Sequence, residues 1–133
     1  ELSNEVIVAE YNDGRFIPVE TYSALPEDFT EHSQAAAIRK HPNGKYIYAT
    51  NRGHNSIAVF EIKDNGKSLD RLQIEPSNGN WPRDFNITPD GHYLVCAHEK
   101  SHNVVLFKIN EDGTITRLDS EIEVPEGIFV DFL

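Results

Sequence analysis

The sequence predicts an all-β fold of short antiparallel strands. Two observations lead to this prediction: one unit occurs nearly twice, and apolar segments of strand length alternate with turn sequences. Residues 38–48 are answered by residues 85–95, and an interval of 47 residues separates Pro42 from Pro89. The apolar periodicity of a helix is missing. A repeat of this length is typical of stacked or radial architectures, whose units bury their apolar faces against one another.

Four segments of the complete repeat are predicted as strands: residues 36–39, 46–50, 56–62 and 68–75. The turn sequence Pro-Asn-Gly at 42–44 joins the first two, and Asp-Asn-Gly at 64–66 joins the last two. The fourth strand is the more polar one, as expected at an outer edge. Four strands with a glycine turn in each copy are typical of a β-propeller blade, whereas a β-sandwich does not repeat residue types at matched positions.

The two ends of the chain fall in incomplete units. Residues 6–11 align with the third strand of the repeat, and residues 124–130 align with residues 81–87, where a first strand begins. The start at Glu1, with no Met and no signal peptide, indicates an internal cut in a longer polypeptide. Soluble proteins avoid unpaired strand edges, so we expect the last strand to complete a blade that begins upstream of Glu1.

The expected organisation is the C-terminal part of a single β-propeller domain. It comprises a partial blade (1–30), two complete blades (31–77 and 78–123) and a closing strand (124–133). The remaining blades, on the missing N-terminal part or on another chain, are therefore an expected partner, because a repeat unit is stabilised by its neighbours.

Composition limits the other partners. The 133 residues include 22 acidic and 12 basic ones, for a formal net charge of −10. Such a field repels phosphate backbones and anionic lipids, so we expect neither nucleic acid nor a membrane as a partner. A few local arginines could still hold a small anion. The one cysteine, Cys96, lies in an apolar strand pattern, which predicts a buried core residue in a reducing, cytoplasmic environment.

One face of the predicted blades collects charged residues. In an antiparallel blade, the loop after the second strand and the connection before the first strand lie on the same face. In that loop Glu1, Arg52 and Glu99 occupy the same place in three successive blades, and Arg83 lies in a connection that leads to an innermost strand. Different charged residues at matched positions are typical of a binding surface. The sequence thus predicts a binding mouth at one end of the central channel.

Three strings in the chain resemble the bacterial lactonase family of seven-bladed propellers. They are Asn-Arg-Gly-His at 51–54, Trp-Pro-Arg-Asp-Phe at 81–85 and Pro-Asn-Gly-Lys at 42–45. The family includes propeller-type 6-phosphogluconolactonases and fungal carboxymuconate cyclases. The first two strings are specific, whereas a Pro-x-Gly turn occurs in many propellers. The resemblance covers the whole chain, which would form roughly the C-terminal two-fifths of a family member.

The resemblance implies a lactone-binding pocket at the channel mouth, with arginines for an anionic substrate and a carboxylate and a histidine near the lactone. Arg52 matches the arginine of the family's Asn-Arg-Gly string, Arg83 that of the Trp-Pro-Arg-Asp string, and Glu1 the glutamate of an Asn-Glu-Leu string. The family's histidine comes from an earlier blade and has no counterpart in this chain. The implied activity is hydrolysis of a sugar-acid lactone, with 6-phosphogluconolactone as the favoured substrate.

The candidate site residues are Glu1 and Arg52 as catalytic groups, and Arg52, Arg83 and His54 as substrate-binding groups. Glu1 would activate a water molecule as a general base, and the arginines would hold the anion and stabilise the tetrahedral oxyanion. Guanidinium groups suit phosphate and carboxylate. No metal or other cofactor is expected, because the six histidines are scattered without a ligand pattern.

Each candidate also has a structural interpretation. Arg52 could tie neighbouring blades through a carboxylate, Arg83 could pair with the adjacent Asp84, and a loop histidine such as His54 is commonly a hydrogen-bonding residue. Trp81 is expected as a packing plug between blades, with stacking on a ligand as the lesser alternative. At the level of the whole protein, the alternative is a non-catalytic propeller that binds a small anionic ligand or a partner protein at the mouth.

Overall fold

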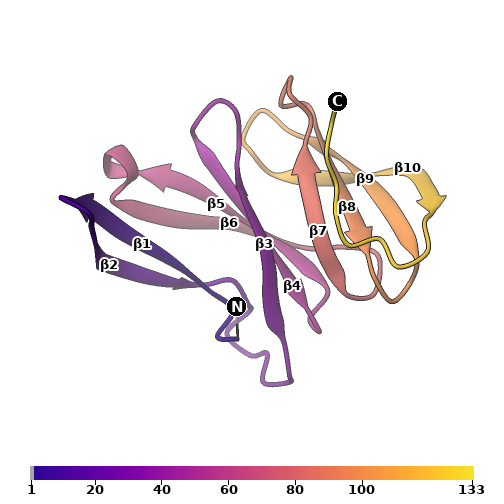
Figure 1. Cartoon of the computed structure of the whole chain (residues 1–133), viewed down its shortest axis with the longest axis horizontal. Helices are drawn as coiled ribbons and strands as arrows, with labels where there is room; N and C mark the ends of the chain where they lie inside the picture. The colour runs from indigo at the N-terminus through magenta and orange to yellow at the C-terminus, as the bar shows by residue number, and fades with distance from the viewer. Residues whose placement is uncertain (1) are drawn as a thin grey trace.

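The computed structural model describes residues 2–133, and they form three antiparallel β-sheets and no α-helix (Figure 1). The first sheet has the order β1-β2, the second β3-β4-β5-β6 and the third β10-β9-β8-β7. The strands are β1 (Glu5–Asn12), β2 (Arg15–Ser23), β3 (Gln34–Lys40), β4 (Tyr46–Arg52), β5 (Ser56–Lys63), β6 (Ser68–Pro76), β7 (Pro82–Ile87), β8 (Tyr93–His98), β9 (Asn103–Ile109) and β10 (Ile115–Glu123). The predicted all-β fold of four-stranded antiparallel blades is confirmed.

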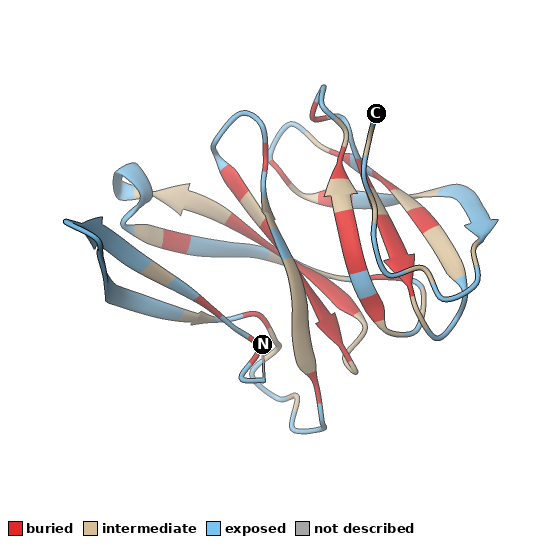
Figure 2. Cartoon of the chain, viewed as in Figure 1, coloured by how far each residue is buried: buried red, intermediate tan, exposed pale blue. Residues whose placement is uncertain are grey.

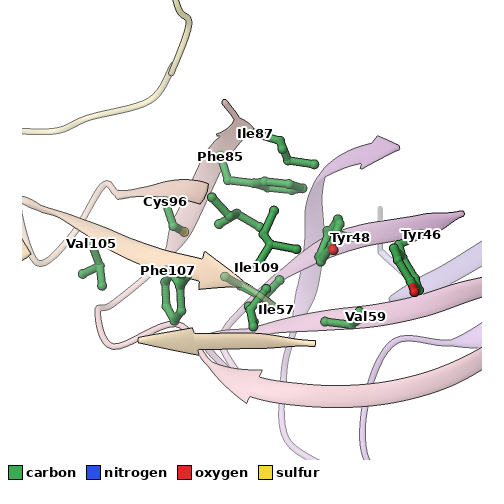
Figure 3. Close-up of a cluster of buried hydrophobic side chains, with 12 residues drawn as sticks. Tyr46, Tyr48, Ile57, Val59, Phe85, Ile87, Cys96, Val105, Phe107 and Ile109 are labelled. Atoms are coloured by element: carbon green, nitrogen blue, oxygen red, sulfur yellow. The ribbon is translucent and has the colours of Figure 1, made fainter. Parts of the chain in front are cut away.

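The main core lies between the two four-stranded sheets. Tyr48 and Ile57 of the second sheet pack with Phe85 and Phe107 of the third, and all four side chains are fully buried (Figure 3). Burial of such side chains stabilises the fold by roughly 1.5–3 kcal/mol each. The Tyr48 hydroxyl also donates a hydrogen bond of 2.8 Å to the carbonyl of Gly113, which joins the two blades.

Cys96 belongs to the same core and is fully buried, as the sequence predicts. Burial raises the pKa of its thiol, because a thiolate would lose its hydration there. Its role in the described chain is therefore that of a small apolar core residue.

The two-stranded sheet β1–β2 is much less covered than the blades that follow it. Only Val6 of β1 is buried, and Tyr11 and Phe16 at its tip are 68% and 75% exposed (Figure 2). A second, smaller cluster packs Val6 and Ala24 against Phe60 of β5. The first sheet is thus attached to the second blade near one end, where Val8 and Tyr22 also pack, and presents apolar side chains such as Tyr11 and Phe16 outward.

One joint, a hydrogen bond within a blade, recurs where the chain leaves each sheet. A residue with positive φ directly precedes the third strand of a blade, and its carbonyl accepts a hydrogen bond from the residue that follows the fourth strand. The three donor–acceptor pairs are Ala24 to Asn4 (2.9 Å), Ser77 to Asn55 (2.9 Å) and Val124 to His102 (2.8 Å). These joints bring each connection next to the loop after a second strand, and so assemble the predicted mouth.

Residues 124–133 follow β10 without forming a strand and lie beside β7 (Figure 1). The backbone N–H of Val130 donates to Asp84 Oδ2 (3.0 Å), and Asn86 Nδ2 donates to the carbonyl of Val130 (3.2 Å). The sequence alignment placed Val124 at the position of Trp81, but the structure gives that position to Glu126. Both Trp81 and Glu126 have positive φ, and both donate their backbone N–H to the side chain of the preceding joint residue. That this segment closes a blade stays a prediction.

Candidate functional site

The Asn-Arg-Gly-His string spans the end of β4 and the loop into β5, on the face where the second blade meets the connection from β2 to β3. Arg52 is the last residue of β4 and is only 6% exposed. Its Nη2 donates a hydrogen bond of 2.8 Å to the carbonyl of Ala35, and its guanidinium carbon lies 5.6 Å from the centre of the Trp81 ring. The structure therefore places Arg52 at the junction of two blades, held against β3 and facing the aromatic ring of the next connection.

Gly53 allows this loop to approach the connection closely. Its φ is +101°, and a Cβ at this position would collide with the carbonyl oxygen of His32 and lie 2.9 Å from the Cα of Ser33. Only glycine avoids both the left-handed strain and the collision. The Ser33 hydroxyl completes the contact by donating to the carbonyl of Arg52 at 2.8 Å.

The other two residues of the string hold the same connection. Asn51 is fully buried, and its Nδ2 donates a hydrogen bond of 2.7 Å to the carbonyl of Ala24. The His54 ring packs edge-on against Phe29 with ring centres 4.6 Å apart, and its Nδ1 lies 2.7 Å from Ser56 Oγ. His54 is half-buried by these contacts, as expected from its alternative interpretation as a hydrogen-bonding loop residue.

Arg83 lies on β7 and is exposed, and its partner differs from the one expected. Its Nε lies 3.9 Å from Glu99 Oε2, so two of the residues assigned to the mouth are brought together. The expected structural pair of Arg83 with Asp84 is wrong. Asp84 instead accepts a hydrogen bond of 3.0 Å from Arg39 Nη2 of β3.

A cavity of about 230 Å³ adjoins these inner strands. Arg39 and Arg83 line it together with small residues of β3, and Phe129 borders it from the terminal segment. Two guanidinium groups therefore flank an open space on the inner side of the blades, where the predicted channel runs.

Trp81 stands between the two loops of the mouth. Its backbone N–H donates to Asn55 Oδ1 (2.9 Å), its carbonyl accepts from the N–H of Glu99 (3.1 Å), and its φ is +68°. Lys100 Nζ lies 3.3 Å from the centre of its ring. Sequence reasoning did not identify Lys100, since a lysine in a polar loop gives no signal of its own. The position of Lys100, directly after Glu99 in the matched loop, was the one hint.

His98 ends β8 at the position that corresponds to Asn51. It is fully buried, its Nδ1 lies 3.2 Å from the carbonyl of Asn103, and its ring packs against the backbone of Gly79 so closely that a side chain there would overlap it. Burial lowers the pKa of His98, because the imidazolium form would lose its hydration. His98 is thus a buried neutral side chain of the joint rather than a group at the surface of the mouth.

Glu1, the predicted general base, lies outside the described residues. Within residues 2–133, no three His, Cys, Asp or Glu side chains gather so that they could hold a metal ion. The same part of the chain contains no helix that is long and apolar enough to cross a membrane.

Sequence comparison identifies relatives over the full chain. The profile of a family described as "Lactonase, 7-bladed beta-propeller" matches residues 1–132. An uncharacterized protein of Staphylococcus epidermidis is 45% identical over 132 residues, which are 98% of this chain and 39% of that protein. The chain therefore spans about two-fifths of the length of the curated relatives that it matches.

Solved structures share this fold. A proposed 6-phosphogluconolactonase of Bacteroides uniformis aligns with all of this chain and 38% of its own, at 35% identity and a TM-score of 0.88. The periplasmic gluconolactonase of Pseudomonas aeruginosa aligns with 95% of this chain and 36% of its own, at 25% identity and a TM-score of 0.90. The arrangement of sheets described above is thus that of a part of longer proteins.

Proposed function

The chain belongs to the family of seven-bladed β-propeller lactonases, and on that premise we propose that the full-length protein hydrolyses the lactone of a sugar acid. The substrate that we propose is 6-phosphogluconolactone, and the product is 6-phosphogluconate. Similarity to a proposed 6-phosphogluconolactonase and to a gluconolactonase supports this class of substrate.

The observation that carries the proposal is the convergence of cationic side chains at the mouth. Arg52 and Lys100 both lie over the ring of Trp81, and Arg83 borders the cavity on the inner side of the blades. This convergence occurs in a chain whose formal net charge is −10. A local cluster of cations in an acidic protein is suited to bind a small anion that the overall field would otherwise repel.

In the proposed mechanism, the cations act on two parts of the substrate. Arg83 and His54 bind the sugar-acid part of the lactone, and Arg52 stabilises the negative charge that develops on the carbonyl oxygen when water attacks. Arg52 is suited to this role because its hydrogen bond to Ala35 fixes the guanidinium before the substrate arrives. Water opens the ring by attacking the carbonyl carbon, and the ring oxygen leaves with a proton.

We propose Glu1 as the group that removes the proton from the attacking water. In the sequence alignment of the repeats, Glu1 corresponds to Arg52. A carboxylate can serve as a general base when it lies within hydrogen-bonding reach of the water. The scheme uses neither a metal ion nor another cofactor.

The second candidate is a non-catalytic propeller that binds a small anion or a partner protein at the same mouth. The burial of Arg52 favours this alternative, because an arginine that is only 6% exposed and holds a backbone carbonyl also fits a purely structural role. Under this alternative, an anion would still bind but no lactone would be consumed.

We further propose that the missing blades of the full-length protein cover the open faces of this chain. The exposed Tyr11 and Phe16 of β1–β2 and Phe129 of the terminal segment are the surfaces that they would bury. We propose a cytoplasmic location, which the single buried cysteine supports without requiring it. Neither nucleic acid nor a membrane is a proposed partner, because the acidic balance repels both.

The proposed function is tested by assaying the purified full-length protein for proton release from 6-phosphogluconolactone and gluconolactone. We expect hydrolysis well above the spontaneous rate, with the phosphorylated lactone preferred. Saturable binding of 6-phosphogluconate without any acceleration of hydrolysis would contradict the enzymatic role and favour the binding protein.

A further inference from the structure

Trp81 has a backbone conformation that is unusual for its residue type. Its φ of +68° lies in the left-handed region, where glycine is at ease and a bulky side chain is strained. Two hydrogen bonds hold it there, one from its N–H to Asn55 Oδ1 and one to its carbonyl from the N–H of Glu99. Glu126, at the equivalent position of the terminal segment, also has a positive φ (50°) and donates its N–H to the preceding joint residue, so the conformation belongs to this connection and the ring is what distinguishes Trp81. Trp81 is thus found at a position where glycine would adopt the same backbone conformation without strain.

The ring of Trp81 collects two cations from two different blades. Lys100 Nζ lies 3.3 Å from the ring centre and the Arg52 guanidinium carbon 5.6 Å from it, both within cation–π range. The backbone of Lys100 is also fixed, because its N–H donates to the carbonyl of Asn80 at 3.2 Å. The two cations are therefore positioned by the fold rather than by a flexible loop.

No carboxylate of the described residues balances the charge of Lys100. Within residues 2–133, no carboxylate forms an ion pair with its ammonium group, and the carboxylate of the adjacent Glu99 is directed to Arg83 instead. An aromatic face stabilises a cation without neutralising it, since the ring carries no net charge. An exposed ammonium held on a ring and lacking a counter-ion is suited to receive an external anion.

We propose that Trp81 and Lys100 form the subsite for the phosphoryl group of the substrate, with Lys100 in direct contact and Trp81 as the positioning residue. The inference rests on the proposed lactonase function and deepens it, because it assigns the preference for a phosphorylated sugar acid to named residues. The ring of Trp81 holds Lys100 near Arg52, so Lys100 can bind the phosphoryl group while Arg52 remains at the lactone carbonyl. An unphosphorylated lactone would use the same mouth without engaging Lys100.

The test uses the full-length protein and its Lys100→Met variant, which keeps the length of the side chain and removes the charge. We expect the ratio of kcat/KM for 6-phosphogluconolactone to kcat/KM for gluconolactone to fall at least tenfold, mainly through KM of the phosphorylated lactone. Trp81→Leu should lower the same ratio in the same direction. The matched control is Lys67→Met, an exposed lysine in the turn between β5 and β6, at the opposite end of its blade, which should leave the ratio unchanged.

Calorimetric binding of 6-phosphogluconate, compared with gluconate, separates this inference from the lactonase proposal. We expect Lys100→Met to weaken binding of 6-phosphogluconate at least tenfold and to change gluconate binding far less. If the wild-type protein hydrolyses no lactone but shows this difference in binding, the subsite stands and the enzymatic function fails. Equal losses for both ligands, or unchanged binding of 6-phosphogluconate in a folded Lys100→Met protein, would overturn the subsite.

Discussion

The loop from β4 to β5 and the loop from β8 to β9 occupy the same place in two successive blades, yet one packs inward and the other projects toward the surface. In the second blade, Arg52 and Gly53 turn inward and hold the connection from the preceding blade. In the third blade, the corresponding Glu99 and Lys100 lie nearer the surface, and Lys100 projects over Trp81. The blade scaffold therefore fixes the position of each loop, while the residue types decide whether the loop packs against the preceding connection or projects to the surface.

The two loops have different residues at one matched position. Gly53 corresponds to Lys100 across the interval of 47 residues. At Gly53, the carbonyl of His32 already occupies the site of a side chain, so none can project there. The third blade has Lys100 at this position, and its side chain extends to the ring of Trp81.

The largest effect is expected for Arg52→Ala in the full-length protein. If Arg52 stabilises the developing oxyanion, hydrolysis of 6-phosphogluconolactone should fall by roughly 100- to 1000-fold, the range that removal of one such donor produces. The measurement is kcat/KM from proton release, together with the midpoint of thermal unfolding.

Arg71→Ala is the matched control for that variant. Like Arg52, Arg71 donates to backbone carbonyls, those of Ser23 (3.0 Å) and Leu25 (2.7 Å), but it does so from the outer strand β6 and is exposed. We expect its kcat/KM to stay within about twofold of wild type, a difference of about 0.4 kcal/mol. Similar losses of kcat/KM in both variants would mean that Arg52 has a structural role only.

Gly53→Ala should have the next largest effect, on stability. The added methyl group meets a left-handed φ and the carbonyl of His32, so we expect a loss of roughly 3 kcal/mol in the free energy of unfolding. Gly44→Ala is the control, because Gly44 also has a positive φ (+77°) but open space around it, and should cost only about 1 kcal/mol. Equal losses in denaturant unfolding would mean that the close approach at Gly53 contributes nothing.

The smallest effect is expected from His98, which replaces Asn51 in the third blade. Because burial lowers the pKa of His98, the unfolded chain binds a proton at this residue more readily than the folded one. The free energy of unfolding should therefore be highest above the unfolded pKa, near 6.5, and decline as the pH falls through and below it.

His98→Asn installs the residue of the second blade and should flatten part of that decline. The checks are denaturant titrations of both proteins at several pH values between about 5 and 8, the range in which histidine titrates. An unchanged pH dependence would show that the pKa of His98 is the same in the folded and unfolded protein.

Much of the fold was predictable because it depends on local signals. The turns at 42–44 and 64–66 and the alternation of apolar segments gave the order of the four strands, which the sheets confirm. The alignment of residues 124–130 was wrong by two positions, since the Trp81 position is set by positive φ and a contact with the joint residue, neither of which is visible as a residue type.

The site was predictable only in part. Matched positions placed Arg83 and Glu99 on one face, and the structure brings them to 3.9 Å. The partner of Asp84 could not be foreseen, because Arg39 reaches it from another blade. Lys100 was missed because a lysine in a polar loop gives no signal of its own. Its environment is the ring of Trp81, which lies 19 residues earlier in the chain and reaches it only through the pairing of β7 with β8.

A crystal structure of the full-length protein with 6-phosphogluconate would test the central claim most directly. We predict that the ligand lies at the mouth formed by the loops after β4 and β8, with its phosphoryl group against Lys100 and its carboxylate within hydrogen-bonding distance of Arg52 or Arg83. A ligand bound at the other end of the blades, beside the turn at 42–44, or a mouth that stays empty at saturating ligand, would contradict the account.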